Sequence, residues 1–496
     1  MMLLSDISFL TWSKWLVALP ACLSWIFAAL TLGLAFVWVV METIAHLTGD
    51  GVWWRMAQRW RRPMVVGGAL SLAGMLLTGG AVAFHWVGLW QRLPWLTDGT
   101  LLLAEGVILL LEILWLLLAL KGRQGPDADE NHHLLFVWLS AMFMGLLLWC
   151  PVAVEAWLEV PVGASPDIAT GALDVTSVLR VLFSSWAVLK FFHILLTSWL
   201  VGAMVLLFVG GRMALARGTE GRQEKYVLWT GVAMGLLCWF GVMCTGDSTG
   251  YGVVHNQSAK MAAMQGVEQG GREVPFTLVG QVKIPKMLSR LGTHSNRGYV
   301  AGRQDILNGY GQEPSVAQKQ AEAQAARVAQ LRWRKAVAQG DGERARRYQA
   351  QWREQGRYLG YSSLEQPADA LPQREGLLFW AFRVMVLLGL SLVVLLGLQF
   401  IPLVRPASKH RHAIWRTARW GLPLALTCSL CGWLLAEMGR EPWTVTGLLP
   451  SWLAVSLWPA SWAMAEIAAV AVLCGVLLVW GWKKISAGWA DFYKES

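Results

Sequence analysis

The feature that most constrains this chain is a series of apolar runs, each long enough to cross a lipid bilayer. One of them is LLLAEGVILLLEILWLLLAL, at residues 101–120. A helix needs about 20 such residues to span the hydrocarbon core. Inside a bilayer every backbone N–H and C=O must be satisfied within the segment, so each run predicts a helix. Only 15% of the 496 residues are charged, well below the share in soluble proteins. We expect an all-α, polytopic membrane protein.

About nine transmembrane helices are expected. They lie at residues 15–42, 63–88, 99–121, 134–157, 181–208, 227–246, 377–403, 412–437 and 462–483. Arg and Lys concentrate in alternate loops, at 53–63, 210–226 and 405–419. The positive-inside rule then places the N-terminus outside and the C-terminus inside. This distribution accounts for the net charge of +10 through membrane orientation, and we expect no nucleic-acid partner.

One long polar insertion interrupts the series. It divides the chain into helices one to six (1–246), a large outward-facing loop region (247–376) and helices seven to nine (377–496). Within the insertion, residues 315–355 are helix formers with charges on all sides. Such a pattern is typical of a solvated helical pair.

Two side chains on either side of the insertion are candidate iron ligands. His193 lies ~18 Å along its span from the outer end, and Met385 lies ~12 Å along the seventh span. Imidazole and thioether together form a heme-iron pair suited to electron transfer. Arg383, two residues before Met385, could pair with a heme propionate. The alternative is that the histidine and the methionine are packing residues.

Several acids lie inside or at the ends of spans, where an ionisable group is expensive unless it faces protein or water. Glu105 and Glu112 are two turns apart on one face of the third span, as a proton path requires. The alternative is two acids hydrogen-bonded inside the bundle. In CGWLLAEMGREPWTV (431–445), Glu437 could ligate iron or relay a proton, with Arg440 beside it. A plain interfacial salt bridge is the alternative there.

The stretch CTGDSTGYGVVHNQSAKMAA (244–263) follows the sixth span. Its Gly and Ser residues predict a structured loop at the outer surface. Asp247 and Lys260 could bind a polar head group there, and a simple surface turn is the alternative.

These motifs together resemble subunit I of the cytochrome bd-type quinol oxidases. AEMGREPW is close to that family's GRQPW signature, with Glu in place of Gln. LTLGLAFVWVVMET (30–43), GDSTGY (246–251), KFFH followed by GAM, and WAFRVMV stand in the family's order and spacing. The nine spans and the large insertion after the sixth also match.

The resemblance implies a role for each matching position. His193 and Met385 match the axial ligands of a low-spin heme b, with Arg383 beside it. Glu437 matches the carboxylate ligand in a paired high-spin heme b and heme d site, with Trp433 and Arg440 around it. Glu105 matches an acid associated with proton delivery, and Lys260 and Asp247 fall in the quinol-binding loop.

The chain also departs from the family. The first-span histidine, an axial ligand of the oxygen-reducing pair, falls at Ser24, and a serine hydroxyl is a poor heme ligand. His85 is the histidine of the second span and a candidate substitute. Glu112 comes one residue earlier than the family's second acid of this span, leaving Ile113 at that register. Gln265 stands where the family's quinol loop carries a glutamate.

The resemblance implies a bd-type oxidase subunit that oxidises quinol and reduces oxygen to water, building a proton gradient without a pump. Its expected partners are quinol, oxygen, the bilayer, a second membrane subunit and a small accessory subunit. The expected location is the bacterial inner membrane. The alternative is a divergent paralogue that carries heme or quinone without reducing oxygen. A transporter using Glu105 and Glu112 is a third possibility, which the absence of an internal repeat disfavours.

Overall fold

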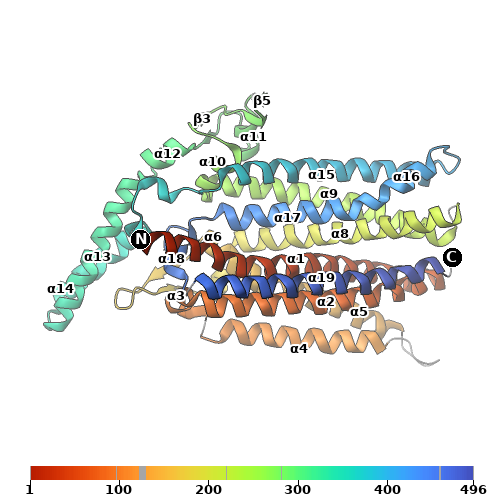
Figure 1. Cartoon of the computed structure of the whole chain (residues 1–496), viewed down its shortest axis with the longest axis horizontal. Helices are drawn as coiled ribbons and strands as arrows, with labels where there is room; N and C mark the ends of the chain where they lie inside the picture. The colour runs from red at the N-terminus through yellow and green to blue at the C-terminus, as the bar shows by residue number, and fades with distance from the viewer. Residues whose placement is uncertain are drawn as a thin grey trace.

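The computed structural model describes residues 2–96, 98–121, 130–218, 221–280, 282–456 and 460–494. Within these ranges, nine helical segments are long and apolar enough to cross a membrane. They run alongside one another in a single elongated bundle (Figure 1). The prediction of an all-α protein with nine spans is therefore confirmed.

Each of the nine spans overlaps one predicted range, and most extend beyond it because polar residues continue the helices past the apolar core. The spans are α1 (Met2–Thr48), α2 (Gly51–His85), α4 (Thr100–Lys121), α5 (Glu130–Leu146) followed by α6 (Trp149–Glu159), α8 (Ser185–Arg217), α9 (Arg222–Asn256), α15 (Glu375–Val404), α17 (Gly421–Gly439) and α19 (Ala460–Lys494).

Short elements connect the spans. They are α3 (Val87–Arg92), η1 (Pro94–Leu96), β1 (Ala164–Pro166), β2 (Leu173–Val175), α7 (Val178–Leu182), α16 (Arg411–Thr417), η4 (Ala418–Trp420), β7 (Trp443–Val445), β8 (Leu449–Pro450) and α18 (Ser451–Ala454). Strands β1 and β2 pair antiparallel, as do β7 and β8.

The insertion gathers at one end of the bundle, which we call the insertion end; α16 lies at the opposite end (Figure 1). The elements of the insertion are α10 (Ser258–Gln265), β3 (Gly271–Arg272), β4 (Phe276–Val279), β5 (Val282–Ile284), α11 (Met287–Thr293), β6 (Tyr299–Val300), α12 (Arg303–Asn308), α13 (Val316–Ala338), α14 (Gly342–Gln355), η2 (Gly356–Ser363) and η3 (Pro367–Ala370). Helices α13 and α14 confirm the predicted helical pair.

The structured loop predicted from residue 244 is wrong, because α9 continues as a helix to Asn256. Two glycines in this stretch are places of close approach. A Cβ on Gly252 would come within 2.3 Å of the Trp186 ring, and one on Gly246 would come 3.6 Å from the imidazole of His193. The small residues therefore let α9 pack tightly on α8, and this packing outweighs their low helix propensity.

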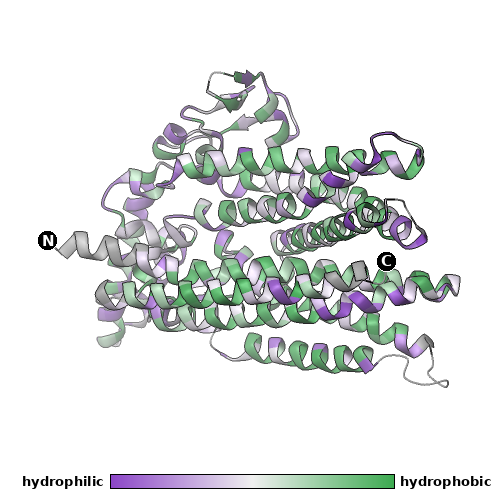
Figure 2. Cartoon of the chain, turned by 45° about the vertical axis from the view of Figure 1, so that its right-hand side comes forward, coloured by the Kyte–Doolittle hydropathy of each residue, from purple (hydrophilic) through white to green (hydrophobic). Residues whose placement is uncertain are grey.

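The spans form two groups that meet along α1 and α8. In one group, α2, α5 and α19 pack around α1; in the other, α8, α9, α15 and α17 pack on one another. The groups meet closely where Gly33 faces Gly202, since a Cβ on Gly33 would fall 2.6 Å from the Gly202 nitrogen. Figure 2 shows apolar residues along the lengths of the helices and hydrophilic ones gathered in the insertion and the connecting loops.

Candidate functional site

His193 lies on α8, in the group of four helices formed by α8, α9, α15 and α17. Its Nδ1 is 2.8 Å from the hydroxyl of Thr245 on α9. That hydroxyl also lies 2.9 Å from the Gly241 carbonyl, which can only accept a hydrogen bond. When the Thr245 proton goes to this carbonyl, the hydroxyl oxygen accepts from His193 Nδ1–H. That arrangement leaves the Nε2 lone pair available, as in metal-ligating histidines.

Met385 lies on α15, the helix of the same group that follows the insertion in sequence. Its sulfur lies against Gly432 of α17, where a Cβ would come 3.5 Å from Sδ. Cys428 on α17 donates to the Met385 carbonyl at 3.3 Å. Met385 is ten residues, or ~15 Å, from the start of α15, and His193 is eight residues, or ~12 Å, from the start of α8. The imidazole and the thioether therefore come from helices of one group at similar depth, and are the side chains that could hold an iron.

Arg383, which the sequence analysis offered as a partner for a heme propionate, binds backbone carbonyls in this structure. Its guanidinium donates to the carbonyls of Met264 at 2.8 Å, Leu278 at 2.9 Å and Thr277 at 2.5 Å. It also lies 3.3 Å from the centroid of the Phe379 ring. Arg383 thus fastens α10 and the β4 hairpin to α15, and so it fixes the insertion above the Met385 helix.

Glu437 occupies the last turns of α17, near the insertion end. Its Oε2 accepts from Arg440 Nη2 at 2.8 Å, and Arg440 Nη1 donates to the Thr444 carbonyl at 3.3 Å. The other Glu437 oxygen has no hydrogen-bond partner among the residues that the structure describes. Trp433 lies one turn earlier on the same face of α17. Glu437 and Arg440 thus form the salt bridge that the sequence analysis gave as the alternative, and an iron-binding role for the second oxygen stays a prediction.

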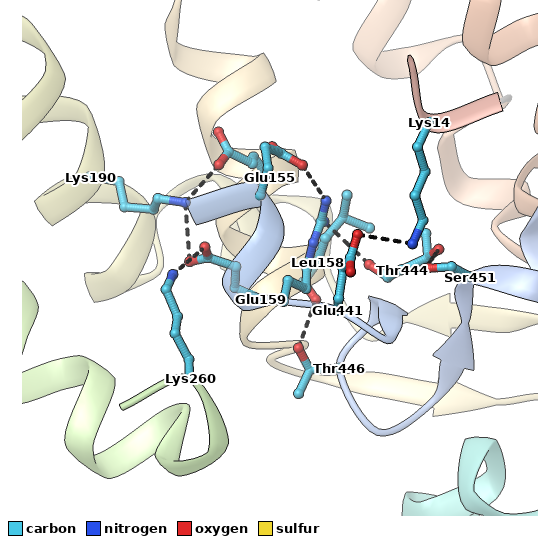
Figure 3. Close-up of polar contacts among 12 residues, drawn as sticks. Lys14, Glu155, Leu158, Glu159, Lys190, Lys260, Glu441, Thr444, Thr446 and Ser451 are labelled. Atoms are coloured by element: carbon cyan, nitrogen blue, oxygen red, sulfur yellow. Dashed lines mark hydrogen bonds and ion pairs between the residues drawn. The ribbon is translucent and has the colours of Figure 1, made fainter. Parts of the chain in front are cut away.

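A buried charge network lies beside this cluster, and the sequence analysis missed most of it. Lys190 on α8 pairs with Glu155 at 3.0 Å and with Glu159 at 3.1 Å, both on α6. Lys260 on α10 reaches Glu159 at 3.3 Å (Figure 3). Trp186 Nε1 also donates to Glu159 at 2.9 Å, and only 1% of Glu159 is exposed. Two carboxylates balance two ammonium groups, as burial requires.

Lys260 points into the bundle and away from the surface. A Cβ on Gly439 would fall 2.7 Å from three carbons of its side chain, so the stem lies flat on the end of α17. Burial lowers the pKa of Lys260, and the Glu159 carboxylate opposes that shift. Asp247 does not join this network. It pairs instead with His294, the residue that follows α11, at 2.9 Å, and both side chains are about half exposed.

The two acids of α4 have separate surroundings. Glu112 is 5% exposed, and Ser140 of α5 donates to its Oε1 at 3.4 Å. Glu105 lies beside Cys150 on α6, and its Oε1 is buried without a hydrogen bond among the described residues. Both acids therefore face the protein, and Ile113 is 45% exposed on the other side of the helix.

A further acid lies near the opposite end of the bundle. Glu42 of α1 accepts from Trp38 Nε1 at 3.2 Å and from Gln58 Nε2 at 2.6 Å. His133 Nε2 lies 3.5 Å from the same carboxylate. A cavity of about 100 Å³ opens there. Its lining includes Glu42, His133, His46 and Asp50.

Ser24 occupies a closed contact between α1 and α2. Its hydroxyl donates to the Ser71 carbonyl at 3.0 Å, and the Ser71 hydroxyl lies 3.3 Å from the Ser24 carbonyl. A Cβ on Gly74 would come within 2.8 Å of the Ser24 nitrogen. His85 pairs with Glu466 of α19 at 3.0 Å and lies ~16 Å further along α2 than Gly74. The Ser24 position therefore does not fit an iron ligand, and His85 lies on a different helix, against Glu466.

Comparison with known proteins places the chain in one family. The sequence profile of the cytochrome bd terminal oxidase subunit I family matches residues 12–487. The chain is 28% identical to the cytochrome bd-II ubiquinol oxidase subunit 1 of Escherichia coli (strain K12), over 90% of this chain and 89% of that one. It is 20% identical to the cytochrome bd ubiquinol oxidase subunit 1 of Bacillus subtilis (strain 168), over 87% of this chain and 82% of that one.

The fold agrees with a solved structure of the same class. The bd oxidase of Geobacillus thermodenitrificans superposes with a TM-score of 0.77 at 18% identity, covering 98% of this chain and 99% of that one. At that identity the likeness shows the fold, and the sequence profile shows the family. The chain is a multi-pass membrane protein that belongs to the cytochrome bd terminal oxidase subunit I family.

Proposed function

We propose that this chain is the heme-binding subunit of a quinol oxidase, taking electrons from quinol near the insertion end and delivering them to oxygen. The observation that carries the proposal is the His193 side chain, whose Nδ1 is committed to Thr245 while Nε2 stays available. Met385 supplies the second ligand from similar depth on α15. The names of the Escherichia coli and Bacillus subtilis relatives, both ubiquinol oxidases, support quinol as the electron donor.

A low-spin heme b bound between His193 and Met385 would supply one-electron transfer, a reaction that no side chain of this protein performs. The chain's own contribution is orientation. Thr245 holds the imidazole in one tautomer, and Gly432 gives the Met385 sulfur room against α17. Glu437, with one oxygen on Arg440 and one free, is the carboxylate that fits the second iron site, with Trp433 beside it.

At the insertion end, α10 is the element that we propose meets the quinol head group. Lys260 pins α10 to α6 through Glu159, and Arg383 pins it to α15 through the Met264 carbonyl. Quinol protons would leave on this side. Asp247 is tied to His294 on the exposed side of α9, so we assign it no contact with the head group.

Protons for oxygen reduction would enter from the opposite end. Glu42 and His133 lie at the cavity there, and Ser140 follows His133 by two turns, or ~10 Å, on the same face of α5. Ser140 bonds Glu112, and Glu105 lies two turns further along α4 toward the insertion end. These groups form a ladder of polar side chains within the apolar bundle, which is what proton transfer across a membrane needs.

The orientation follows from charge. Basic residues of α2, α8 and α16 lie at the opposite end, so we place that end and the C-terminus in the cytoplasm of a bacterium, and the N-terminus in the periplasm. A second membrane subunit would complete the complex. The third possibility from the sequence, a heme-free transporter, predicts a colourless protein.

The test of electron entry is the reduced-minus-oxidised spectrum of His193→Ala in the purified full-length protein. We expect the low-spin b signal to vanish. His255→Ala is the matched control, because His255 lies on α9 at an exposed position and bonds only the Tyr251 carbonyl among the described residues. An unchanged low-spin signal in His193→Ala would overturn the proposal.

A divergent paralogue that transfers electrons without reducing oxygen is the second candidate. The closed contact at Ser24 favours it, because that position offers no ligand to the oxygen-reducing pair. Heme extraction and iron analysis separate the candidates. Three hemes per chain, including a high-spin heme b and heme d, support the oxidase. One low-spin heme per chain supports the paralogue.

A further inference from the structure

A cavity of about 170 Å³ lies where the helical pair α13–α14 rests on the insertion end of the bundle. The β1–β2 hairpin closes one side, since Gln330 donates to the Ile168 carbonyl at 2.8 Å and Trp352 Nε1 donates to the Pro166 carbonyl at 2.8 Å. The segments after α2 and around β8 close the other side. The cavity is therefore built from four parts of the chain that are distant in sequence.

Three arginines converge on this cavity from different elements. They are Arg92 of α3 and Arg327 and Arg334 of α13. Each is held by one or two neutral acceptors: Arg92 by the Leu453 carbonyl at 2.9 Å, Arg327 by the Ser362 hydroxyl at 2.5 Å, and Arg334 by the Ala169 carbonyl at 2.8 Å. A guanidinium has five N–H donors, so each arginine keeps several unused.

The cavity lacks a counter-charge. No Asp or Glu lines it, and within the described residues none of the three arginines forms an ion pair with a carboxylate. Burial and the nearby positive charge of Arg327 lower the pKa of Arg92. Like charges brought together in this way repel one another unless an anion joins them, and planar guanidinium groups are the donors best suited to phosphate oxygens.

We propose that this cavity binds a phosphate group between Arg92, Arg327 and Arg334. A cavity of about 150 Å³ holds a benzene-sized molecule, so a tetrahedral oxyanion fits. Leucines line the remaining wall, among them Leu448 and Leu453. The phosphate comes either from a phospholipid head group, with the leucines covering the start of its glycerol, or from the free anion. In both cases it ties α13 to α3 and holds the helical pair on the bundle.

The test uses the purified full-length protein in phosphate-free and sulfate-free buffer. One arm titrates inorganic phosphate and follows the thermal midpoint, with sodium chloride at equal ionic strength as the reference. The other arm counts retained lipids by native mass spectrometry after exposure to phosphatidylglycerol or phosphatidylcholine. A phosphate effect assigns the site to the free anion, and selective retention of phosphatidylglycerol without a phosphate effect assigns it to a lipid.

Arg327→Gln is the decisive variant, because Arg327 is exposed and we expect its loss to leave the fold intact. We expect the affinity of this variant for inorganic phosphate or phosphatidylglycerol, whichever the wild type binds, to fall at least tenfold. Arg332→Gln removes the same charge from the same helix away from the cavity and is expected to bind as the wild type does. Two results would overturn the proposal: no preference for phosphate over chloride together with none for the anionic lipid, or equal binding by Arg327→Gln.

Discussion

The two groups of spans differ at the positions where the family resemblance expects an iron ligand. In the group of α8, α9, α15 and α17, Thr245 satisfies one nitrogen of His193 and leaves the other available. In the group around α1, Ser24 and Ser71 satisfy each other, and α2 closes over them. A side chain that binds a cofactor must keep one polar atom available, and the mutual hydrogen bonds of Ser24 and Ser71 leave none at that position. The difference separates a position that can hold iron from one that only packs.

The largest expected effect tests whether the charge network beside the site is structural. Glu159→Ala removes the one carboxylate paired with Lys260 among the described residues and leaves that ammonium buried. We expect a loss of about 3–5 kcal/mol in stability, because an unpaired buried charge is costly. Thermal unfolding measures it. Glu268→Gln breaks an exposed pair with Arg303 at 3.8 Å and is expected to cost little. A Glu159→Ala protein as stable as Glu268→Gln would contradict the account.

The next effect concerns proton delivery. Glu112→Gln keeps the shape of the side chain and its contact with Ser140 but cannot carry a proton. We expect quinol-driven oxygen consumption to fall about a hundredfold, a typical loss for a missing acid or base. The low-spin heme spectrum is expected to stay unchanged, which separates this loss from misfolding. Oxygen consumption at the wild-type rate would remove Glu112 from the path.

Thr245→Val tests whether the hydrogen bond to Thr245 positions the His193 imidazole. The valine no longer accepts from His193 Nδ1, so the tautomer is no longer fixed. Loss of such a supporting partner typically costs 10–100-fold in metal affinity, and we expect heme retention to fall accordingly. The matched control is Thr249→Val, one turn further on α9, whose hydroxyl bonds only the Thr245 carbonyl among the described residues. Equal heme retention in both variants would show that Thr245 does not position the imidazole.

The smallest effect is expected at Ser24. Ser24→Ala removes one hydrogen bond between α1 and α2 and is expected to cost about 1 kcal/mol. Ser71→Ala should behave alike, because the two residues bond each other. Neither change is expected to alter heme content or spectrum. A spectral change in Ser24→Ala alone would identify Ser24 as an iron ligand and break the contrast between the two groups.

Features fixed by local chemistry could be predicted from the sequence. The nine spans follow from apolar runs, and the α13–α14 pair follows from a run of helix formers with caps at Ser315 and Asp341. His193 and Glu437 could be singled out as candidates because ionisable groups inside a span are rare, and Met385 because its depth matches that of His193. The continuation of α9 could not, because it depends on Trp186 packing over Gly252.

Contacts between elements that are distant in the chain could not be predicted from the sequence. The network of Glu159, Lys190 and Lys260 joins α6, α8 and α10, and no spacing along the chain relates them. The sequence offered one signal for Glu159 and Lys190. Each is a charged residue within two turns of the end of a span. The partners of Arg383 are backbone carbonyls of the insertion, which carry no signature in the residue types.

The most direct measurement is a cryo-electron microscopy map of the purified protein, read in the space between α8 and α15. The account predicts a planar macrocycle whose iron is bonded by His193 Nε2 and Met385 Sδ, with His193 Nδ1 on Thr245 and Ser24 bonded to Ser71. A map in which His193 and Met385 face lipid, or in which no group lies between them, would contradict it.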